Sequence, residues 1–165
     1  WFTSTPLARP LDLSAALQRA LGPGSASFTA HDVAPGTLHG LVGRVNVSFL
    51  ELRYRRLRPL LEWREVPCRV ASLDDLACMK LGAAVQRGSR KDFVDVYALG
   101  TAHRPLRDLL RLYRRKFEID DIGHVLVGLS YFDDAERTPM PRMLWRVSWR
   151  AIRTTIESWV KETSG

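Results

Sequence analysis

Two cations of this chain fall among apolar side chains when its sequence is drawn as a helix. Residues 73–87 predict a helix, because leucine and alanine recur there at helical spacing. At about 100° per residue, Lys80 and Arg87 lie within the apolar face. A charge in apolar surroundings is costly unless it is paired. Two interpretations stay open. One is an internal salt bridge, or a side chain that reaches the edge of the core. The other is an anion cradle, whose two cations lie roughly 10 Å apart along the axis and suit a nucleoside triphosphate tail.

Two carboxylates follow on the next predicted helix. Ser89 and Asp92 have the spacing of a capping box, as Ser72 and Asp75 do at the start of the preceding helix. Asp95 comes one turn later among apolar residues, where a carboxylate needs a cationic partner. We therefore expect Asp92 or Asp95 within ion-pair reach of a nearby cation. The candidates nearest in sequence are Lys80, Arg87 and Arg90.

Residues 73–99 resemble the helical motif of the AbiEii/AbiGii-type toxin nucleotidyltransferases, bacterial members of the DNA polymerase β-like nucleotidyltransferase superfamily. That motif reads roughly Asp-Leu-Ala-x-x-Lys, then Ala, then Arg, then Arg-Asp-x-x-Asp-x-Tyr. The matching positions here are Asp75, Leu76, Ala77, Lys80, Ala83, Arg87, Arg90, Asp92, Asp95 and Tyr97. Lys91 departs from the motif, as an insertion beside the usual Arg-Asp pair.

The resemblance implies an activity and a set of roles. It implies transfer of a nucleotide from a nucleoside triphosphate to an acceptor, often transfer RNA, in a toxin–antitoxin or phage-defence setting with an antitoxin protein as partner. It implies catalytic roles for Lys80 and Asp92. It implies nucleotide binding by Lys80, Arg87, Arg90 and Asp95.

The resemblance also implies a magnesium site, held in that family by an Asp-x-Asp pair on a strand that runs on into an aromatic-Phe-Thr sequence. This chain opens with Trp1-Phe2-Thr3, so the resemblance implies that the sequence starts just after the metal aspartates. The central strand has Asn46 and Ser48 where a third metal carboxylate is expected. We therefore assign no metal ligand within this chain and expect Mg²⁺ in the complete enzyme. We expect little or no transfer activity from these 165 residues alone.

The elements that must position these residues come in two groups. A short helix is predicted over 11–21, followed by strand-like runs over 27–33, 37–42, 44–52 and 66–71. Helices are predicted over 73–87, 90–100, 104–117, 121–132 and 148–163. The fold class is α+β: an incomplete nucleotidyltransferase-like mixed β-sheet flanked by helices, then a C-terminal helical half. We expect residues 1–72 to be the remnant of the α/β core and 73–165 the helical half.

Arginine gives the chain its formal net charge of +7, with 21 Arg against 4 Lys. Codon bias in a GC-rich genome and a phosphate-rich partner both explain this excess. The predicted helix 104–117 decides little between them, because its basic face suits solvent as well as RNA. On the second interpretation Arg107, Arg111 and Arg114 contact the RNA backbone.

Other chemistry is not indicated. The four histidines are scattered, and no phosphate-loop, dinucleotide or nucleophile-elbow motif occurs. Cys68 and Cys78 match no disulfide or metal framework, and no apolar run could span a membrane, so we expect a cytoplasmic protein with reduced thiols. Two alternatives to the enzyme remain: a non-catalytic basic module that binds RNA or protein, and a regulatory pseudo-enzyme that binds nucleotide without turnover.

Overall fold

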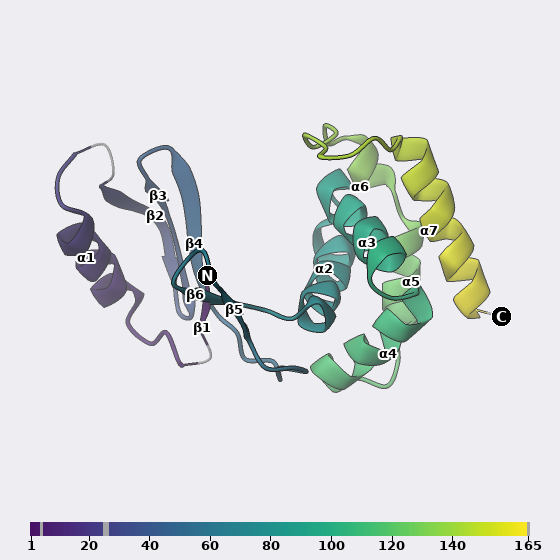
Figure 1. The fold of residues 1–165 in the computed structure, drawn as a ribbon, viewed down its shortest axis with the longest axis horizontal. Coiled ribbons are helices and arrows are strands. Elements are labelled where there is room, and N and C mark those ends of the chain that lie inside the picture. Colours follow the sequence, from purple (N-terminus) through teal and green to yellow (C-terminus); the bar gives the residue numbers. More distant parts are fainter. Residues whose placement is uncertain (4, 25–26, 165) are drawn as a thin grey trace. The chain divides into compact units, whose positions relative to one another are not determined.

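Among the residues that the structure describes, four strands and one helix lie between Phe2 and Glu51, and helices predominate from Leu73 onward, as the sequence predicts (Figure 1). The structure is a computed structural model, and it describes residues 1–3, 5–24 and 27–164. The fold is mixed α+β, which confirms the predicted class. Two compact units divide the chain, Trp1–Tyr54 and Arg55–Gly165.

The first unit is a four-stranded mixed sheet with one helix packed on it. The strand order is β1 (Phe2–Thr3), β4 (Val45–Glu51), β3 (Thr37–Val42) and β2 (Phe28–Ala34), and only the β1–β4 pair is parallel. Helix α1 (Pro10–Leu21) packs on β2 and β3. The alternation of apolar and polar residues along β4 gave the clearest strand prediction, and the strand forms there.

The second unit begins with a short hairpin and continues as a helical bundle. Strand β5 (Leu61–Trp63), which the sequence pattern did not indicate, pairs antiparallel with β6 (Cys68–Val70). The helices that follow are α2 (Leu73–Arg87), α3 (Arg90–Ala102), α4 (Leu106–Phe117), α5 (Gly123–Ser130), α6 (Asp133–Glu136) and α7 (Trp149–Ser164). The single helix predicted over 121–132 is α5, and α6 is a separate short turn of helix.

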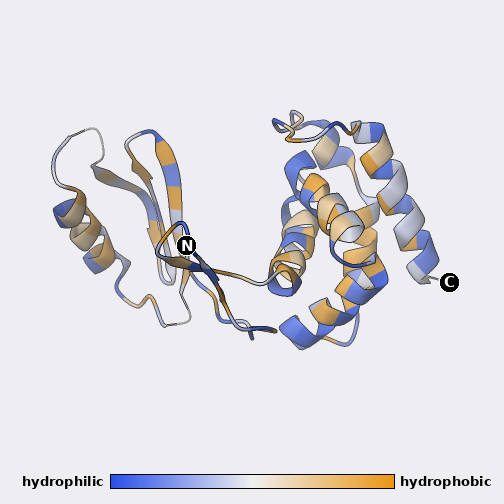
Figure 2. Ribbon diagram, in the orientation of Figure 1, coloured by the Kyte–Doolittle hydropathy of each residue, from blue (hydrophilic) through white to orange (hydrophobic). Residues whose placement is uncertain are grey.

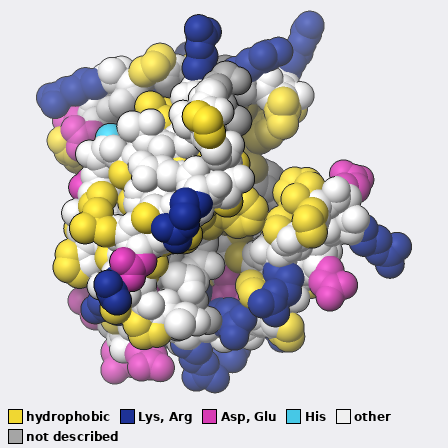
Figure 3. All heavy atoms as spheres, turned by 90° about the vertical axis from the view of Figure 1, so that its left-hand side faces the viewer, with side chains coloured by type: hydrophobic (Ala, Val, Ile, Leu, Met, Phe, Trp, Pro, Cys, Tyr) yellow, Lys and Arg dark blue, Asp and Glu magenta, His cyan; other side chains and the backbone are white. Residues whose placement is uncertain are grey.

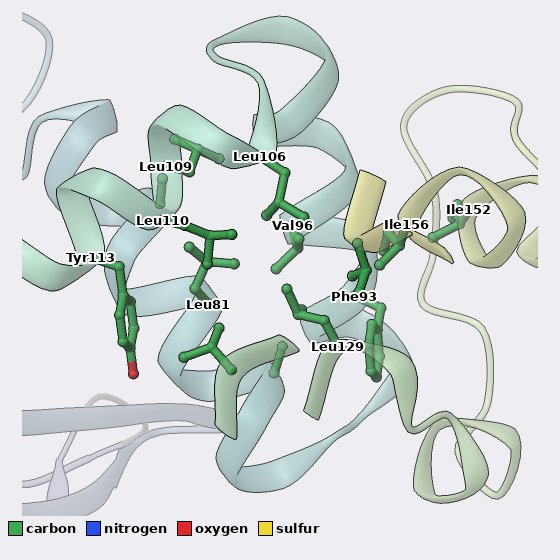
Figure 4. Close-up of a cluster of buried hydrophobic side chains, with 14 of the residues drawn as sticks. Leu81, Phe93, Val96, Leu106, Leu109, Leu110, Tyr113, Leu129, Ile152 and Ile156 are labelled. Atoms are coloured by element: carbon green, nitrogen blue, oxygen red, sulfur yellow. The ribbon is translucent and has the colours of Figure 1, made fainter. Parts of the chain in front are cut away.

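One apolar core holds the second unit together. Leu81 of α2, Phe93 of α3 and Leu110 of α4 point toward one another with Leu129 of α5 and Ile156 of α7 (Figure 4). The ribbon of α4 carries both hydrophobic and hydrophilic bands, as expected of an amphipathic helix that buries one face (Figure 2). Burying a side chain of this size stabilises the fold by about 1.5–3 kcal/mol. Helices α2 and α3 are thus fixed relative to each other by their shared core.

The turn between α2 and α3 is two residues long. Gly88 ends α2 with φ +59°, a left-handed conformation that glycine adopts without strain, and its N–H donates to the carbonyl of Ala84. Ser89 then starts α3. This tight turn keeps the motif residues of the two helices close. Within residues 1–3, 5–24 and 27–164, no helix combines the length and apolar character needed to cross a membrane.

Candidate functional site

The two helices of the motif are joined by an ion pair at their middle. Lys80 Nζ of α2 lies 2.7 Å from Oδ2 of Asp95 on α3. Both side chains keep about a third of their surface exposed, 33% for Lys80 and 39% for Asp95. This pair confirms the expected contact between the motif's cations and carboxylates. Because an ammonium has three donors, Lys80 retains N–H groups that a solvent-borne anion can reach.

A second ion pair lies at the α2–α3 turn, between the last residue of α2 and the first turn of α3. Arg87 donates from Nη2 to Oδ1 of Asp92 at 2.7 Å. Asp92 is wholly buried, whereas 58% of the Arg87 side chain is exposed. Arg87 is therefore a surface residue that neutralises a buried carboxylate, and its remaining N–H groups face solvent. The sequence placed Arg87 within an apolar face, and this exposure corrects that expectation: the residue sits in the last turn of α2, where the core ends.

Ser89 and Asp92 do not form the capping box that their spacing predicts. Ser89 makes no side-chain hydrogen bond to the backbone of α3. Its hydroxyl donates to Oδ2 of Asp92 instead. Asp92 thus accepts from both Ser89 and Arg87, which satisfies both oxygens of a buried carboxylate. The capping box predicted at the start of α2 is confirmed in part, because Ser72 Oγ accepts a hydrogen bond from the backbone N–H of Asp75 at 3.1 Å.

Arg90 is held apart from this cluster by other partners. Its Nη2 lies 3.3 Å from both the carbonyl oxygen and Oε2 of Glu136, at the end of α6. The guanidinium also lies 5.0 Å from the centre of the Trp149 ring, close enough for a cation–π contact. Only 16% of the Arg90 side chain is exposed, so its guanidinium links α3 to α6 and α7.

The sequence pattern missed a second charged cluster, which lies at the start of α2. Asp74 and Asp75 are both buried. Asp74 accepts from Nε of Arg58 at 3.0 Å, from Nε of Arg104 at 2.8 Å, and contacts His103 Nε2 at 2.8 Å. The sequence showed Asp74 only as part of the acidic first turn of a helix, which is ordinarily solvated, and Asp75 as a capping-box and motif residue.

Asp75 forms the other half of this cluster and is equally buried. Its carboxylate accepts from the ammonium of Lys116 at 2.7 Å and from the backbone N–H groups of Leu57 and Arg58 at 2.9 and 3.1 Å. Ser72 Oγ lies 2.8 Å from Oδ2 of Asp75. Lys116 also donates to the carbonyl of Arg55 at 2.9 Å. The side chains of both members are almost wholly buried, so this is a structural pair that fixes α2, α4 and residues 55–58 together.

The environments of these groups change their pKa values. Burial by itself raises the pKa of Asp74, but the hydrogen bonds from Arg104, Arg58 and His103 outweigh it and bring the pKa down to about 2. For Asp75, burial likewise raises the pKa, and the bonds from Lys116, the Leu57 N–H and Ser72 lower it below the usual value. Burial raises the pKa of Cys78 to about 12, so its thiol is not a nucleophile at neutral pH.

The arginines of α4 do not share one environment. Arg107 lines a hollow with residues of α7, among them Trp159 and Glu162. Arg111 pairs with Asp108 of its own helix at 3.0 Å, and Arg114 lies 3.7 Å from Asp120. All three are exposed. Elsewhere the positive charge is spread out: on the face seen in Figure 3, Lys and Arg side chains lie at several separate points.

A magnesium site does not fit the carboxylates of this motif. Asp92 and Asp95 are each engaged by a cation, and Asp92 has no exposed surface. Among the residues for which the structure gives coordinates, no three His, Cys, Asp or Glu side chains are grouped as metal ligands. Mg²⁺ prefers several oxygen ligands in near-octahedral geometry. We therefore derive no step through a metal ion from this chain.

Comparison with known proteins identifies the motif region independently. The family model described as "Nucleotidyl transferase AbiEii toxin, Type IV TA system" matches residues 36–160. A protein of Aquifex aeolicus (strain VF5), named "Uncharacterized protein aq_aa25", is 36% identical over 100 residues, which are 60% of this chain and 48% of that protein. The chain thus spans about half the length of the curated relative it matches. No solved structure matches this chain.

Proposed function

We propose that this chain, which belongs to the AbiEii family of nucleotidyl transferase toxins because the family model matches residues 36–160, carries the nucleotide-binding part of such an enzyme. The complete protein then transfers a nucleotide from a nucleoside triphosphate to an acceptor, within a toxin–antitoxin system. The observation that carries the proposal is the double ion pair of the motif, Lys80 with Asp95 and Arg87 with Asp92. Each pair leaves cationic N–H groups open to solvent.

Lys80 and Arg87 bind the phosphates in this proposal. They lie seven residues apart on α2, which is roughly 10 Å along the helix axis. Asp95 and Asp92 hold the two cations in place, so the phosphates meet side chains that are already oriented. Lys80 is the catalytic cation that stabilises charge on the reacting phosphate, and Asp92, which is wholly buried, acts through Arg87 as a positioning residue. Asp95 completes the nucleotide contacts, and Arg90, whose guanidinium contacts Glu136 and Trp149, supports the site only by holding α3 against α6 and α7.

A magnesium ion supplies charge neutralisation on the triphosphate in enzymes of this reaction class. Its ligands in the complete protein belong to residues outside the motif described above. This chain alone is expected to bind triphosphate and to transfer little or no nucleotide.

The acceptor is proposed to be RNA, because the basic residues of α4 are exposed, and transfer RNA in particular, because the resemblance of the motif implies it. Arg107, Arg111 and Arg114 are the proposed RNA contacts. An antitoxin protein is the expected second partner, and the cytoplasm the expected location.

Calorimetric titration with inorganic tripolyphosphate, and then with each of the four ribonucleoside triphosphates, tests the nucleotide site. We expect binding by the parent chain and at least a tenfold loss in the Lys80→Met/Arg87→Met variant, because both proposed phosphate contacts are removed. Lys91→Met/Lys161→Met is the control matched in charge, since both lysines are exposed and neither has a partner of opposite charge among the residues described. Equal affinity in the parent and in Lys80→Met/Arg87→Met would refute the site.

A non-catalytic basic module is the second candidate, favoured by the exposed arginines of α4 and the lack of fit to magnesium. The two proposals differ in one result. The enzyme proposal requires triphosphate binding that depends on Lys80 and Arg87. The module requires RNA or protein binding with no affinity for triphosphate.

A further inference from the structure

A buried carboxylate holds two arginines at the surface of the helical unit. Asp74, of which 4% is exposed, accepts a hydrogen bond from Nε of Arg58 and another from Nε of Arg104. Both arginines use Nε for this contact. Their Nη groups make no hydrogen bond to any other residue that the structure describes, while 56% of the Arg58 and 42% of the Arg104 side chain is exposed. Each guanidinium is thus fixed at its base and keeps its outer pair of N–H groups for a ligand.

These two arginines line a surface hollow with two more from α4. The hollow has a volume of about 480 Å³, and its walls are Arg58, Arg104, Asp108, Arg111, Leu112 and Arg115. A second hollow of about 530 Å³ adjoins it, because Arg111 and Arg115 line both. In the first hollow four guanidinium groups face a single surface carboxylate, that of Asp108. We call this first hollow, with its four arginines, the Asp74-braced basin.

We propose that the Asp74-braced basin binds the phosphate backbone of a nucleic acid. A guanidinium presents paired N–H groups that match two phosphate oxygens, and its orientation here is set before any ligand arrives. Arg111 and Arg115 lie four residues apart on α4, roughly 6 Å along its axis, and Arg58 and Arg104 add two further guanidinium groups to the same hollow. A nucleic-acid strand carries one phosphate per about 3.4 Å of its axis, so the basin can meet several phosphates at once.

The composition of the basin argues against an acidic protein as occupant. Protein–protein interfaces have an apolar core surrounded by a polar rim. Leu112 is the one aliphatic residue in the wall of the basin, and the other wall residues are charged. A chain of phosphates needs no apolar core, since its affinity comes from ion contacts and counterion release.

This inference rests on the proposed function only in that both involve nucleic acid, and it extends the acceptor contact to Arg58, Arg104 and Arg115. Its test measures binding and not transfer. Unchanged triphosphate binding in Lys80→Met would refute the nucleotide site and leave the basin untouched. The same salt dependence of nucleic-acid binding in the parent and in a variant that lacks the basin arginines would refute the basin and leave the nucleotide site untouched.

The experiment is a salt titration of binding to a fluorescently labelled RNA hairpin, and to DNA of the same sequence, by the full chain. The Arg111→Gln/Arg115→Gln variant leaves the Asp74 contacts intact, so it should fold as the parent does. We expect its affinity to be roughly tenfold lower or more, and its slope of log affinity against log salt to be smaller by about two, one for each lost phosphate contact. The matched control is Arg64→Gln/Arg69→Gln, which removes the same charge from two exposed residues of the β5–β6 hairpin.

Three results would overturn the proposal. An equal loss in the control variant would mean that overall charge, and not the basin, attracts the nucleic acid. An unchanged slope in the basin variant would mean that its arginines contact no phosphate. Competition by poly-glutamate as strong as that by unlabelled RNA would identify an acidic protein as the partner. Tighter binding of the RNA than of the DNA would show that the basin prefers an RNA backbone. Equal binding would show that it accepts the phosphates of either nucleic acid, and both results support the basin. A second variant, Arg58→Gln/Arg104→Gln, should lose affinity similarly once its folding is verified by denaturant unfolding.

Discussion

Lys116 Nζ lies 2.7 Å from Oδ1 of Asp75, although 41 positions separate the two residues in the chain. The side chains are almost wholly buried, with 0% and 5% exposed. The ammonium has a second acceptor in the carbonyl of Arg55, and the carboxylate has further donors in the backbone of residues 57 and 58. A buried pair of this kind is stable only because each member satisfies the other's charge and hydrogen bonds.

Lys116→Met should therefore destabilise the protein strongly. Removing the ammonium leaves the Asp75 carboxylate buried without its cation, which costs about 3–5 kcal/mol. Lys161→Met, at an exposed position of α7, is the control and should change the free energy of unfolding by less than about 0.5 kcal/mol. Urea unfolding of the two variants and the parent measures both values. A loss of under 1 kcal/mol in Lys116→Met would show that the pair contributes little.

Lys80→Met should change the stability of the protein little and its phosphate binding strongly. The Lys80–Asp95 pair is about one-third exposed, and pairs at the surface contribute about 0–1 kcal/mol. We expect a change in unfolding free energy below about 1 kcal/mol, together with the loss of tripolyphosphate binding. A variant that unfolds as easily as Lys116→Met would mean that Lys80 is a structural salt bridge, the alternative that the sequence left open.

Asp74 should make stability depend on acidity. Its folded pKa of about 2 is below the ordinary value of 3.8, so the ionised form favours folding. This contribution, about 2 kcal/mol, is fully present above about pH 5 and is lost as the pH falls through about 2. Asp74→Asn lacks this contribution. The difference in unfolding free energy between parent and variant should therefore narrow as the pH falls from about 5 to about 2. Chemical unfolding at stepped pH measures this difference; a constant difference would contradict the assigned hydrogen bonds.

The two thiols should differ in reactivity. Cys78 is buried and its pKa is raised to about 12, whereas Cys68 on β6 is half-buried. Iodoacetamide at neutral pH should therefore label the folded protein at Cys68, and label Cys78 only after denaturation. Mass spectrometry counts the adducts, with Cys68→Ser as the control. Rapid labelling of that variant in its folded state would mean that the core around Cys78 opens readily.

Much of the fold could be predicted because its signals are local. The capped start of α2 at Ser72, the glycine at its end and the alternation along β4 each lie within a few residues of the element they specify. The pairing of Lys80 and Arg87 with the acids of α3 was predictable for the same reason, since a two-residue turn joins the helices. Strand β5 escaped prediction because its three residues, Leu-Glu-Trp, include no β-branched side chain and are too few to show alternation.

The Asp75–Lys116 pair could not be predicted from spacing, because the two residues belong to separate helices. One signal was available. On a helix of 100° per residue, Lys116 falls at about 280° from Leu106, beside Leu109 at about 300°. It therefore lies on the apolar stripe of α4, the same anomaly that drew attention to Lys80 on α2. The surrounding arginines concealed it, since a lysine within a basic run is ordinarily solvated.

The contact between α3 and α7 constrains how the chain can vary among its relatives. A Cβ atom at Gly100 would clash with the Trp159 ring, and Tyr97 stacks on that ring with centroids 6.1 Å apart. A side chain at position 100 would need the space that the Trp159 ring occupies, so the residues at positions 100 and 159 are expected to change together. Relatives with a larger residue at the first should have a smaller side chain than tryptophan at the second. Such paired exchange marks the α3–α7 contact as an inherited constraint, independent of the residues that bind phosphate.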